Sequence, residues 1–396
     1  MIEITLLTPR QPDWATAVDH LYYQLGGGNN PTLLPYHFLQ VVLPQIGGHL
    51  ACIQQGDAVS GMAVLLPRQQ PGHFTLRLQK QAADNMTADA HVVQLLQQQL
   101  PGARFTLYDP HTAQSFSPTH QQLASGEMLV DIGQPDAAEA AAIRTFQQRI
   151  WGNPPEFLYP SDIHSTAFAL GTSLVARVAG ALAGFLIGFD KFISTADPVR
   201  LESQILGVLP EYRKLRIGAL LKQTQAQQAL ARGLQVINWT ADPLQYPNAA
   251  LNFGLLRAVA FDFYADYYPF RNELNRAPAS RLGLTWQIDS QPVQDALRHL
   301  APATVLNVDQ TPALVRVNDG HATVDLTATA PTIAIEIPTH WTALQQQDFP
   351  LAMRWRAATD TLFTHYLGSG PGKYVVTGVA AAGERRFLLA QRVDAG

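Results

Sequence analysis

Basic side chains gather at one point of the sequence, where they could bind a phosphate group. Arg213, Lys214 and Arg216 follow Pro210, which ends an apolar stretch at 205–209. Apolar residues then recur along one helical face, at Ile217, Leu220, Leu221, Ala226, Ala229 and Leu230. The first turn of a helix has unpaired N–H groups and the positive end of the helix dipole, so it attracts anions. The pattern predicts a strand, a basic turn and a helix that hold a phosphorylated cofactor.

The same stretch resembles the acyl-CoA pyrophosphate loop of the GNAT acetyltransferase superfamily, whose pattern is (Q/R)-x-x-G-x-(G/A). Arg213 matches its first position and Gly218 its last, where a missing Cβ lets a ligand approach the backbone. Arg216 replaces the first glycine; its charge suits a phosphate, but its side chain could equally crowd the site. The resemblance implies a cofactor loop made of Arg213, Lys214, Leu215, Arg216, Ile217 and Gly218. A solvated basic turn is the alternative.

Further motifs, in the same order, make the chain similar to one branch of predicted GNAT acetyltransferases. They are RIWG at 149–152, GFLIGFD at 184–190, WTADPL at 239–244, NAALN at 248–252, DYYP at 266–269 and LNRAPASR at 274–281. IPTHW at 337–341 and AMRWR at 352–356 continue the resemblance. The resemblance implies acetyl-CoA as co-substrate and direct attack of an amine on the acetyl thioester.

Length and composition limit the classes to which the chain can belong. Its 396 residues have room for two or three domains, and 47% of them are apolar. Charged residues make up 15%, the net charge is −4, and no lysine-rich block indicates nucleic-acid binding. No apolar run approaches the roughly 18 residues of a membrane span, and the start does not resemble a signal peptide. We therefore expect a soluble cytoplasmic protein.

Metal and thiol chemistry are not predicted. The 12 histidines show no pair with HExxH or HxH spacing, so we expect no metal. The single cysteine, Cys52, lies in an apolar strand-like stretch and is interpreted as buried packing rather than a nucleophile.

The order of predicted elements indicates an α/β fold with a GNAT-like mixed sheet flanked by helices, and two GNAT-like units in one chain. Residues 1–133 have the order β-α-α-β-β-β-α-β, but the loop at 78–90 has no glycine, so they are interpreted as a degenerate GNAT-like domain. Residues 134–296 form the predicted acyl-CoA-binding domain. Residues 297–396 form a β-α-β-β extension, which resembles the opening half of a GNAT fold and is expected to dock on the N-terminal half or complete a sheet with it.

Three local predictions matter below. Residues 109–125 are expected to be a polar connector, and 161–169 a helix. Residues 261–268 are expected to form one strand.

The resemblance also implies groups that act on the thioester and the amine. A backbone N–H near Leu206, Gly207 and Val208 would stabilise the thioester oxygen, with Gly207 permitting a bulge. Glu202 is the candidate general base, and an ion-paired strand residue is the alternative. Asp242 is the second candidate, unless it only forms an Asp-Pro turn. Glu211 is interpreted as a capping residue.

The proton donor to the leaving thiolate departs from the family pattern. The family places a tyrosine seven residues after the position of Asn248, a predicted cofactor contact, but here that residue is Leu255. The branch motif favours Tyr267 or Tyr268 instead, with aromatic packing as the alternative. Arg257 also replaces a residue that is preferentially glycine.

We therefore expect an N-acetyltransferase that moves an acetyl group from acetyl-CoA to an amine of a small molecule or peptide. The alternative is a non-catalytic acyl-CoA-binding or scaffolding protein, which the departures at Arg216, Leu255 and Arg257 favour. The sequence does not identify the acceptor, and a homodimer is one option for the oligomeric state.

Overall fold

The computed structural model describes residues 2–9, 11–81, 89–168, 171–194, 197–268, 271 and 275–394. Its contacts divide the chain into two compact units, Met1–Gln225 and Ala226–Gly396. The division falls inside helix α5 (Ile217–Ala231). The domain limits that we place at residues 133 and 296 stay predictions.

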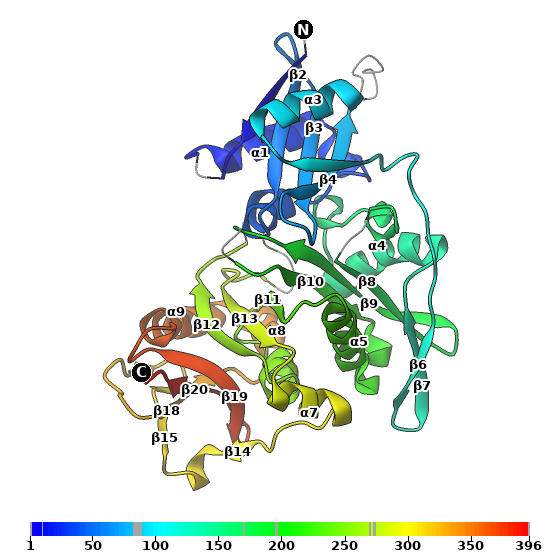
Figure 1. Cartoon of the computed structure of the whole chain (residues 1–396). Helices are drawn as coiled ribbons and strands as arrows, with labels where there is room; N and C mark the ends of the chain where they lie inside the picture. Colours follow the sequence, from blue (N-terminus) through cyan, green and yellow to red (C-terminus); the bar gives the residue numbers. More distant parts are fainter. Residues whose placement is uncertain are drawn as a thin grey trace. The chain divides into compact units, whose positions relative to one another are not determined.

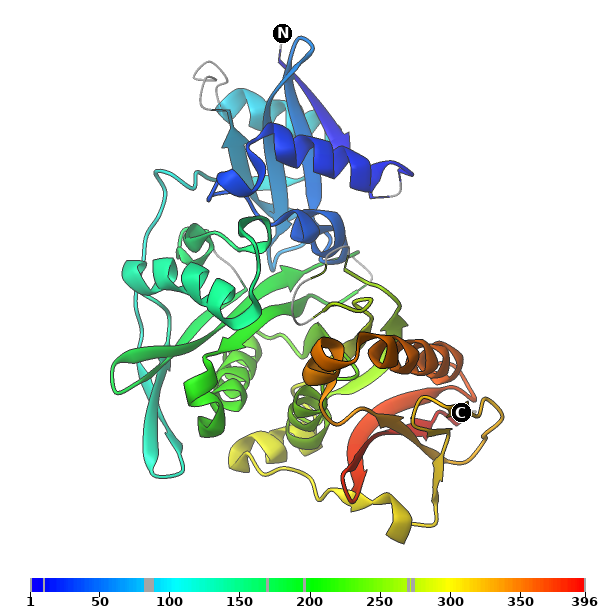
Figure 2. The same cartoon turned by 180° about the vertical axis from the view of Figure 1, so that it is seen from behind.

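The first part of unit 1 is a five-stranded sheet with helices on both faces. Its strands are β1 (Ile2–Leu7), β2 (His49–Gln55), β3 (Ala58–Pro67), β4 (His73–Lys80) and β5 (Arg104–Tyr108). They lie in chain order, antiparallel except for the parallel pair β4–β5. The main helices are α1 (Trp14–Gln24) and α3 (Asp89–Gln99), and Figures 1 and 2 show them on opposite faces of the sheet. This order confirms the predicted β-α-α-β-β-β-α-β pattern, the second helix being a π-helical turn at Phe38–Val42 continued by α2 (Leu43–Gln45).

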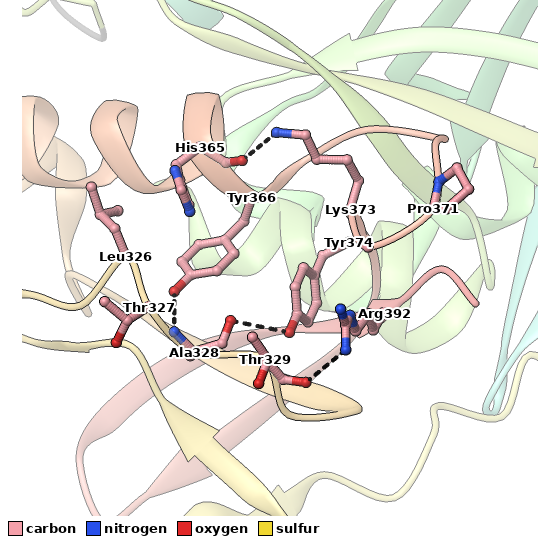
Figure 3. Close-up of a pocket in the computed structure, with 11 residues that line it drawn as sticks. Leu326, Thr327, Ala328, Thr329, His365, Tyr366, Pro371, Lys373, Tyr374 and Arg392 are labelled. Carbon is pink, nitrogen blue, oxygen red and sulfur yellow. Dashed lines mark hydrogen bonds between the residues drawn. The ribbon is translucent and has the colours of Figure 1, made fainter. Parts of the chain in front are cut away.

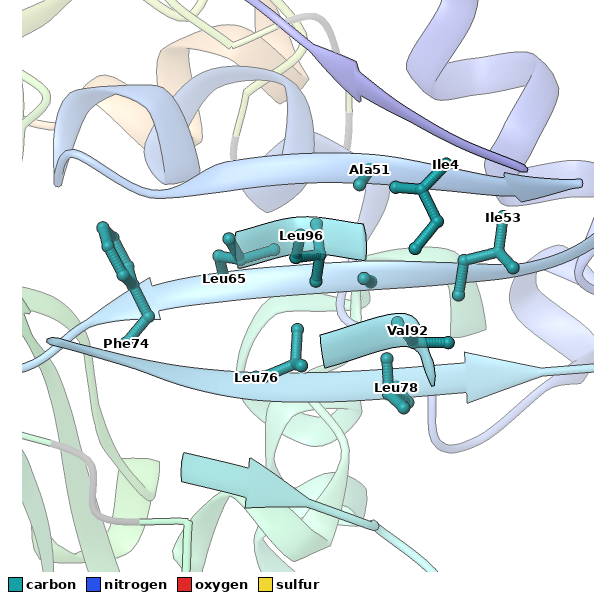
Figure 4. Close-up of a cluster of buried hydrophobic side chains, with 10 residues drawn as sticks. Ile4, Ala51, Ile53, Leu65, Phe74, Leu76, Leu78, Val92 and Leu96 are labelled. Atoms are coloured by element: carbon teal, nitrogen blue, oxygen red, sulfur yellow. The ribbon is translucent and has the colours of Figure 1, made fainter. Parts of the chain in front are cut away.

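One face of this sheet packs on α3 (Figure 4). Alternate residues of the strands point to this face because successive side chains of a strand point to opposite sides. The buried set is Ile4, Ala51, Ile53, Ala63, Leu65, Phe74, Leu76, Leu78, Val92 and Leu96. Val92 and Leu96 lie one helical turn apart on α3 and so meet the same strands.

The second part of unit 1 is an antiparallel sheet with the order β6-β7-β8-β9-β10. The strands are β6 (Gln121–Ser125), β7 (Met128–Gly133), β8 (Thr172–Val178), β9 (Ala181–Lys191) and β10 (Arg200–Val208). Helix α4 (Ala137–Trp151) begins with a capping box between Asp136 and Glu139 and ends at Gly152, which has a left-handed conformation.

Two local predictions for this part are wrong. The predicted connector ends in strand β6, which forms a hairpin with β7 around Gly126. Its exposed, polar residues show no apolar alternation that could reveal a strand. The predicted helix at 161–169 is a single 3₁₀ turn, Ser161–His164, and Ala169 lies outside the described residues. Asp162 and His164 bind Arg77 and Ser173 respectively, so side-chain partners stabilise this turn.

Unit 2 is built on a mixed sheet with the order β15-β18-β20-β19-β12-β13-β11. The long strands are β11 (Val236–Ala241), β12 (Val259–Tyr264), β13 (Arg281–Gln287), β18 (Thr332–Ile337), β19 (Tyr374–Ala382) and β20 (Arg385–Arg392). The short ones are β14 (Leu306–Asn307), which pairs with β19, and β15 (Leu314–Arg316). Two more short strands, β16 (Asn318–Asp319) and β17 (Thr323–Val324), form a separate two-stranded sheet. The helices are α6 (Tyr246–Ala249), α7 (Gln291–His299), α8 (Trp341–Gln347) and α9 (Phe349–Tyr366), and a π-helical turn at Ala250–Leu255 extends α6.

Among the residues that the structure describes, those of the C-terminal region form no sheet with the N-terminal strands. Strand β19 pairs with β12 at Ala260 and Val376, so the region extends the sheet of unit 2, and β1–β5 form a separate sheet. Strand β20 lies between β18 and β19 and pairs antiparallel with both. The predicted β-α-β-β order of this region is confirmed by β18, α9, β19 and β20. The alternative in which the region completes a sheet with the N-terminal strands is wrong, because strand partners are chosen by packing between distant segments. Its docking on the N-terminal half stays a prediction.

Strand β12 ends earlier than predicted, at Tyr264. Tyr267 and Tyr268 therefore lie after the strand. Among the described residues, no helix is both long and apolar enough to span a bilayer.

Candidate functional site

The predicted cofactor loop is an exposed turn that leads into α5. After β10, Pro210–Leu215 forms a 3₁₀ turn, Arg216 adopts a left-handed conformation with φ 51°, and α5 begins at Ile217. The hydroxyl of Ser125 donates to the carbonyl of Leu215 at 2.6 Å, which ties the turn to the β6–β7 hairpin. The loop thus has a defined backbone conformation.

The side chains of this loop suit an anion. Arg213, Lys214 and Arg216 are exposed, whereas Ile217 is buried and anchors the helix start. Guanidinium, ammonium and the N–H groups of a helix start are the donors that phosphates prefer. The residues present therefore fit a pyrophosphate group. Glu211, predicted to be a capping residue, instead pairs with Arg149 at 2.8 Å.

Two arginines have a backbone conformation that glycine adopts more readily. Arg216 and Arg257 both have left-handed conformations, with φ values of 51° and 60°. Glycine adopts this region freely, whereas a residue with a Cβ loses about 1–2 kcal/mol. Arg216 and Arg257 therefore form turns that glycine would form at a lower cost.

The end of β10 differs from the prediction. Leu206, Gly207 and Val208 pair regularly with β9, and the register shift lies earlier, between Ser203 and Ile205. The prediction of a bulge at Gly207 is therefore wrong. Gly207 is small for another reason, because a Cβ there would come within 3.0 Å of Phe185, Ile150 and Trp151. The assignment of a thioester-oxygen donor to 206–208 stays a prediction.

Glu202 lies on β10 and is buried, with 6% of its surface exposed. Lys191 of β9 donates to Glu202 Oε2 at 3.2 Å. Opposite Glu202 on β9 is Phe189, whose ring lies 4.7 Å from that of Phe38 and 6.4 Å from that of Tyr159. Glu202 is thus a carboxylate with a cationic partner beside an aromatic wall, an arrangement that suits either a general base or an ion pair.

Lys222, which sequence analysis missed, is a buried lysine of α5. Its Nζ donates to Ser203 Oγ at 2.8 Å and to Gln225 Oε1 at 3.4 Å. Burial lowers the pKa of Lys222 to about 7, although the charge of Glu202 acts in the opposite direction. Lys222 lies off the apolar stripe that the sequence predicts, so helical spacing provided no signal.

A lysine with a lowered pKa makes stability depend on pH. Between pH 7 and about 10 the unfolded chain binds a proton that folded Lys222 has lost, so stability rises with pH in this window. Lys222→Met is expected to remove a rise on the order of 2 kcal/mol between pH 7 and pH 9. Urea unfolding of both proteins at the two pH values measures it. Equal pH dependence of the two proteins would show that Lys222 keeps an ordinary pKa.

Asp242, the second candidate base, lies in a buried network of unit 2. Both its carboxylate oxygens accept bonds from Arg356 Nη2, at 3.0 and 2.9 Å, and Oδ2 also accepts from Trp341 Nε1 at 3.1 Å. Oδ1 accepts from the N–H of Leu244 at 3.0 Å, as in an Asp-Pro turn. With its oxygens occupied in this way, Asp242 is better suited to structure than to proton transfer.

The two tyrosines proposed as proton donors lie in the same network. Tyr268 is buried, its hydroxyl is 3.3 Å from Thr240 Oγ1, and Arg281 stacks 5.3 Å from its ring centre. Tyr267 contacts Tyr268 edge to face at 4.6 Å. These contacts fit the packing alternative, and the catalytic role of both residues stays a prediction.

The other predicted positions in unit 2 lie around α6. Asn248 is exposed on this helix, and Leu255 is buried at the end of the π-helical turn. Pro269 and Leu274, which belong to two of the motifs, lie outside the described residues.

A cavity of about 260 Å³ in unit 2 lies among residues that the sequence analysis did not select (Figure 3). Its wall includes the rings of Tyr366 and Tyr374, whose hydroxyls donate to the carbonyls of Asp325 and Ala330, both at 2.8 Å. Lys373 Nζ donates to the carbonyl of His365 at 2.6 Å, and Arg392 to that of Thr329 at 3.2 Å. The polar side chains that line this cavity thus donate hydrogen bonds to backbone carbonyls and stabilise the surrounding chain.

Comparison with known proteins finds no matching family model and no match among curated proteins. Among solved structures, the ribosomal-protein-S18-alanine N-acetyltransferase from Escherichia coli is 15% identical, has a TM-score of 0.32, and is matched over 41% of this chain and 95% of its own. The diaminobutyrate acetyltransferase EctA from Paenibacillus lautus, solved with L-2,4-diaminobutyric acid and coenzyme A, is 17% identical, with a TM-score of 0.32 and coverage of 41% and 98%. The acetyltransferase of GNAT family from Streptococcus pneumoniae is 14% identical, with a TM-score of 0.32 and coverage of 39% and 97%. Each of these three acetyltransferases is matched over about two fifths of this chain, and the similarity is one of fold alone.

Proposed function

We propose that this protein is an acyl-CoA-dependent N-acyltransferase that moves an acetyl group from acetyl-CoA to an amine. The observation that carries the proposal is the loop before α5, where Arg213, Lys214 and Arg216 expose three positive charges around a left-handed turn. Such a loop supplies both the charge and the backbone donors that a pyrophosphate needs. The acceptor is a small molecule or a peptide.

Acetyl-CoA, when bound, supplies an activated acetyl thioester. The chain's own part is to bind the pyrophosphate through the loop at 213–218 and to accept, at the carboxylate of Glu202, the proton that the substrate ammonium loses before its neutral amine attacks the thioester. Lys191 orients that carboxylate through its bond to Oε2. We assign the backbone N–H groups at 206–208 to stabilising the thioester oxygen. We assign the hydroxyl of Tyr267 or Tyr268 to donating a proton to the leaving thiolate.

The first test is the melting temperature with and without acetyl-CoA, with free CoA as control. A ligand at about 100 times its dissociation constant adds roughly 2.7 kcal/mol to the stability of the folded protein. In a domain of about 200 residues this is a rise of roughly 5–10 °C. We expect both ligands to raise the melting temperature, because both carry the pyrophosphate.

The Arg216→Gly variant separates the enzyme from the scaffolding alternative. If the wild-type protein and the variant both respond to CoA, the loop binds the cofactor as proposed. If only the glycine variant responds, the side chain of Arg216 closes the site in the natural chain, and the scaffolding alternative holds. If neither protein responds while both melt cooperatively, acyl-CoA binding is refuted.

A further inference from the structure

The cavity of about 260 Å³ in unit 2 has one wall that side chains hold in place. This wall is the stretch 325–330, which has no regular secondary structure. Tyr366 Oη of α9 accepts from the N–H of Ala328 at 3.1 Å, and Tyr374 Oη of β19 donates to the carbonyl of Ala330 at 2.8 Å. These two hydroxyls join the stretch to a helix and a strand, so the cavity has a defined shape.

Two cationic side chains at the ends of adjacent strands line this cavity. Lys373 precedes β19 and Arg392 ends β20, and the N–H of Val393 donates to the carbonyl of Lys373 at 2.7 Å. Lys373 uses one N–H on the carbonyl of His365, and Arg392 uses one on the carbonyl of Thr329. An ammonium has three N–H groups and a guanidinium five, so most of their donors can still bind a ligand.

The charge of the cavity is positive and is not balanced by its own wall. None of the 11 described residues that line it is acidic, and no carboxylate in the described part of the chain pairs with Lys373 or Arg392. Asp360, which lies in the neighbouring hollow, accepts instead from Ser280 Oγ at 2.7 Å. Like charges that share a cavity repel each other, and an anion between them removes the repulsion. The positive charge therefore favours an anionic ligand.

The remaining wall suits a flat apolar group. The rings of Tyr366 and Tyr374 meet edge to face, with their centres 5.3 Å apart, and Figure 3 shows both beside the cationic side chains. Leu326 and Pro371 add apolar surface. Aromatic and apolar side chains of this kind bind the hydrophobic body of a ligand. The volume lies just below the range of roughly 300–1,000 Å³ that is typical of ligand pockets, so it has room for about one ring with its acid group.

We propose that this cavity binds a small organic anion, in which a carboxylate or phosphate group is attached to a single apolar ring. Arg392 and Lys373 bind the anionic group, because guanidinium and ammonium are the donors that carboxylates and phosphates prefer. The rings of Tyr366 and Tyr374 contact the apolar part. The site lies wholly within unit 2 and does not involve the loop at 213–218, so it goes beyond the proposed function.

The first part of the test is calorimetric titration of the full-length protein with benzoate and with phenyl phosphate. Benzyl alcohol, which has the ring without the charge, is the control. We expect a dissociation constant on the order of 1 mM for at least one anion and no binding of benzyl alcohol. Tighter binding of benzoate indicates a carboxylate ligand, and tighter binding of phenyl phosphate indicates a phosphate ester.

The second part locates the bound anion with three variants that change exposed residues. Arg392→Met and Lys373→Met are each expected to weaken binding about tenfold, because each removes a charge-assisted hydrogen bond. Arg354→Met is the matched control, since Arg354 is exposed on α9 and does not line the cavity, and it is expected to bind with wild-type affinity.

Four results would overturn the proposal. They are no binding of either anion by the wild-type protein, equal binding of benzyl alcohol, an equal loss of affinity in Arg354→Met, and unchanged affinity in either cavity variant. The last result would place the anion elsewhere, for example at the basic loop before α5. None of these results depends on acyl-CoA binding, so the proposed function is tested separately.

Discussion

Replacing Asp162 by alanine is expected to lower the free energy of unfolding by about 3–5 kcal/mol, because it leaves the guanidinium of Arg77 buried without its counter-charge. Arg77 and Asp162 expose 1% and 3% of their side chains and form a two-point ion pair between β4 and the 3₁₀ turn at 161–164. The carbonyl of Thr32 accepts a further bond from Arg77, and that of Asp162 accepts from Tyr108 at 3.0 Å. Urea unfolding measures the loss.

Two further variants test the cause. Asp89→Ala removes a half-exposed ion pair with Lys80 from the same sheet and is expected to cost less than about 1 kcal/mol. The double variant Arg77→Met with Asp162→Leu removes both buried charges and is expected to recover most of the stability. If the double variant is less stable than Asp162→Ala, the uncompensated charge is not the cause.

Glu202→Gln is expected to lower kcat by about 10²–10⁴-fold, because glutamine keeps the shape of the side chain but cannot accept a proton. Affinity for acetyl-CoA is expected to stay unchanged. The measurement is the release of free CoA thiol with an amine acceptor identified by screening. A loss confined to kcat indicates a group that acts in the transition state.

Lys191→Met is the matched control for Glu202, since it breaks the same ion pair from the other side. A general base at Glu202 predicts a much smaller loss of kcat for this variant than for Glu202→Gln. Similar losses in the two variants, together with similar losses of stability, would show that Glu202 is only the partner of Lys191.

Many of the strands and helices could be predicted from the sequence, because their signals are local. Alternation of apolar residues marked β1, and Ala179 and Gly180, both with positive φ, marked the turn of the β8–β9 hairpin. Helical periodicity marked α5 and α9. Segments without such patterns were missed, namely strand β6, helix α8 and the short strands between 306 and 324. Helix α7 was also missed, although Val293, Ala296 and Leu297 have helical spacing and are buried.

The contacts of the candidate site and of the buried ion pairs likewise differ in whether the sequence could predict them. By itself the sequence determined the basic loop before α5, because charge, proline and helical spacing lie within a dozen residues of one another. Only the tertiary structure decided that Arg356 binds Asp242, 114 residues away, and that Arg77 binds Asp162, 85 residues away. A buried charge needs an oppositely charged partner. The local sequence does not identify that partner, because the pairing depends on which distant segments pack together. The pairing of strand β19 with β12 also depends on the packing of distant segments and was therefore visible only in the tertiary structure.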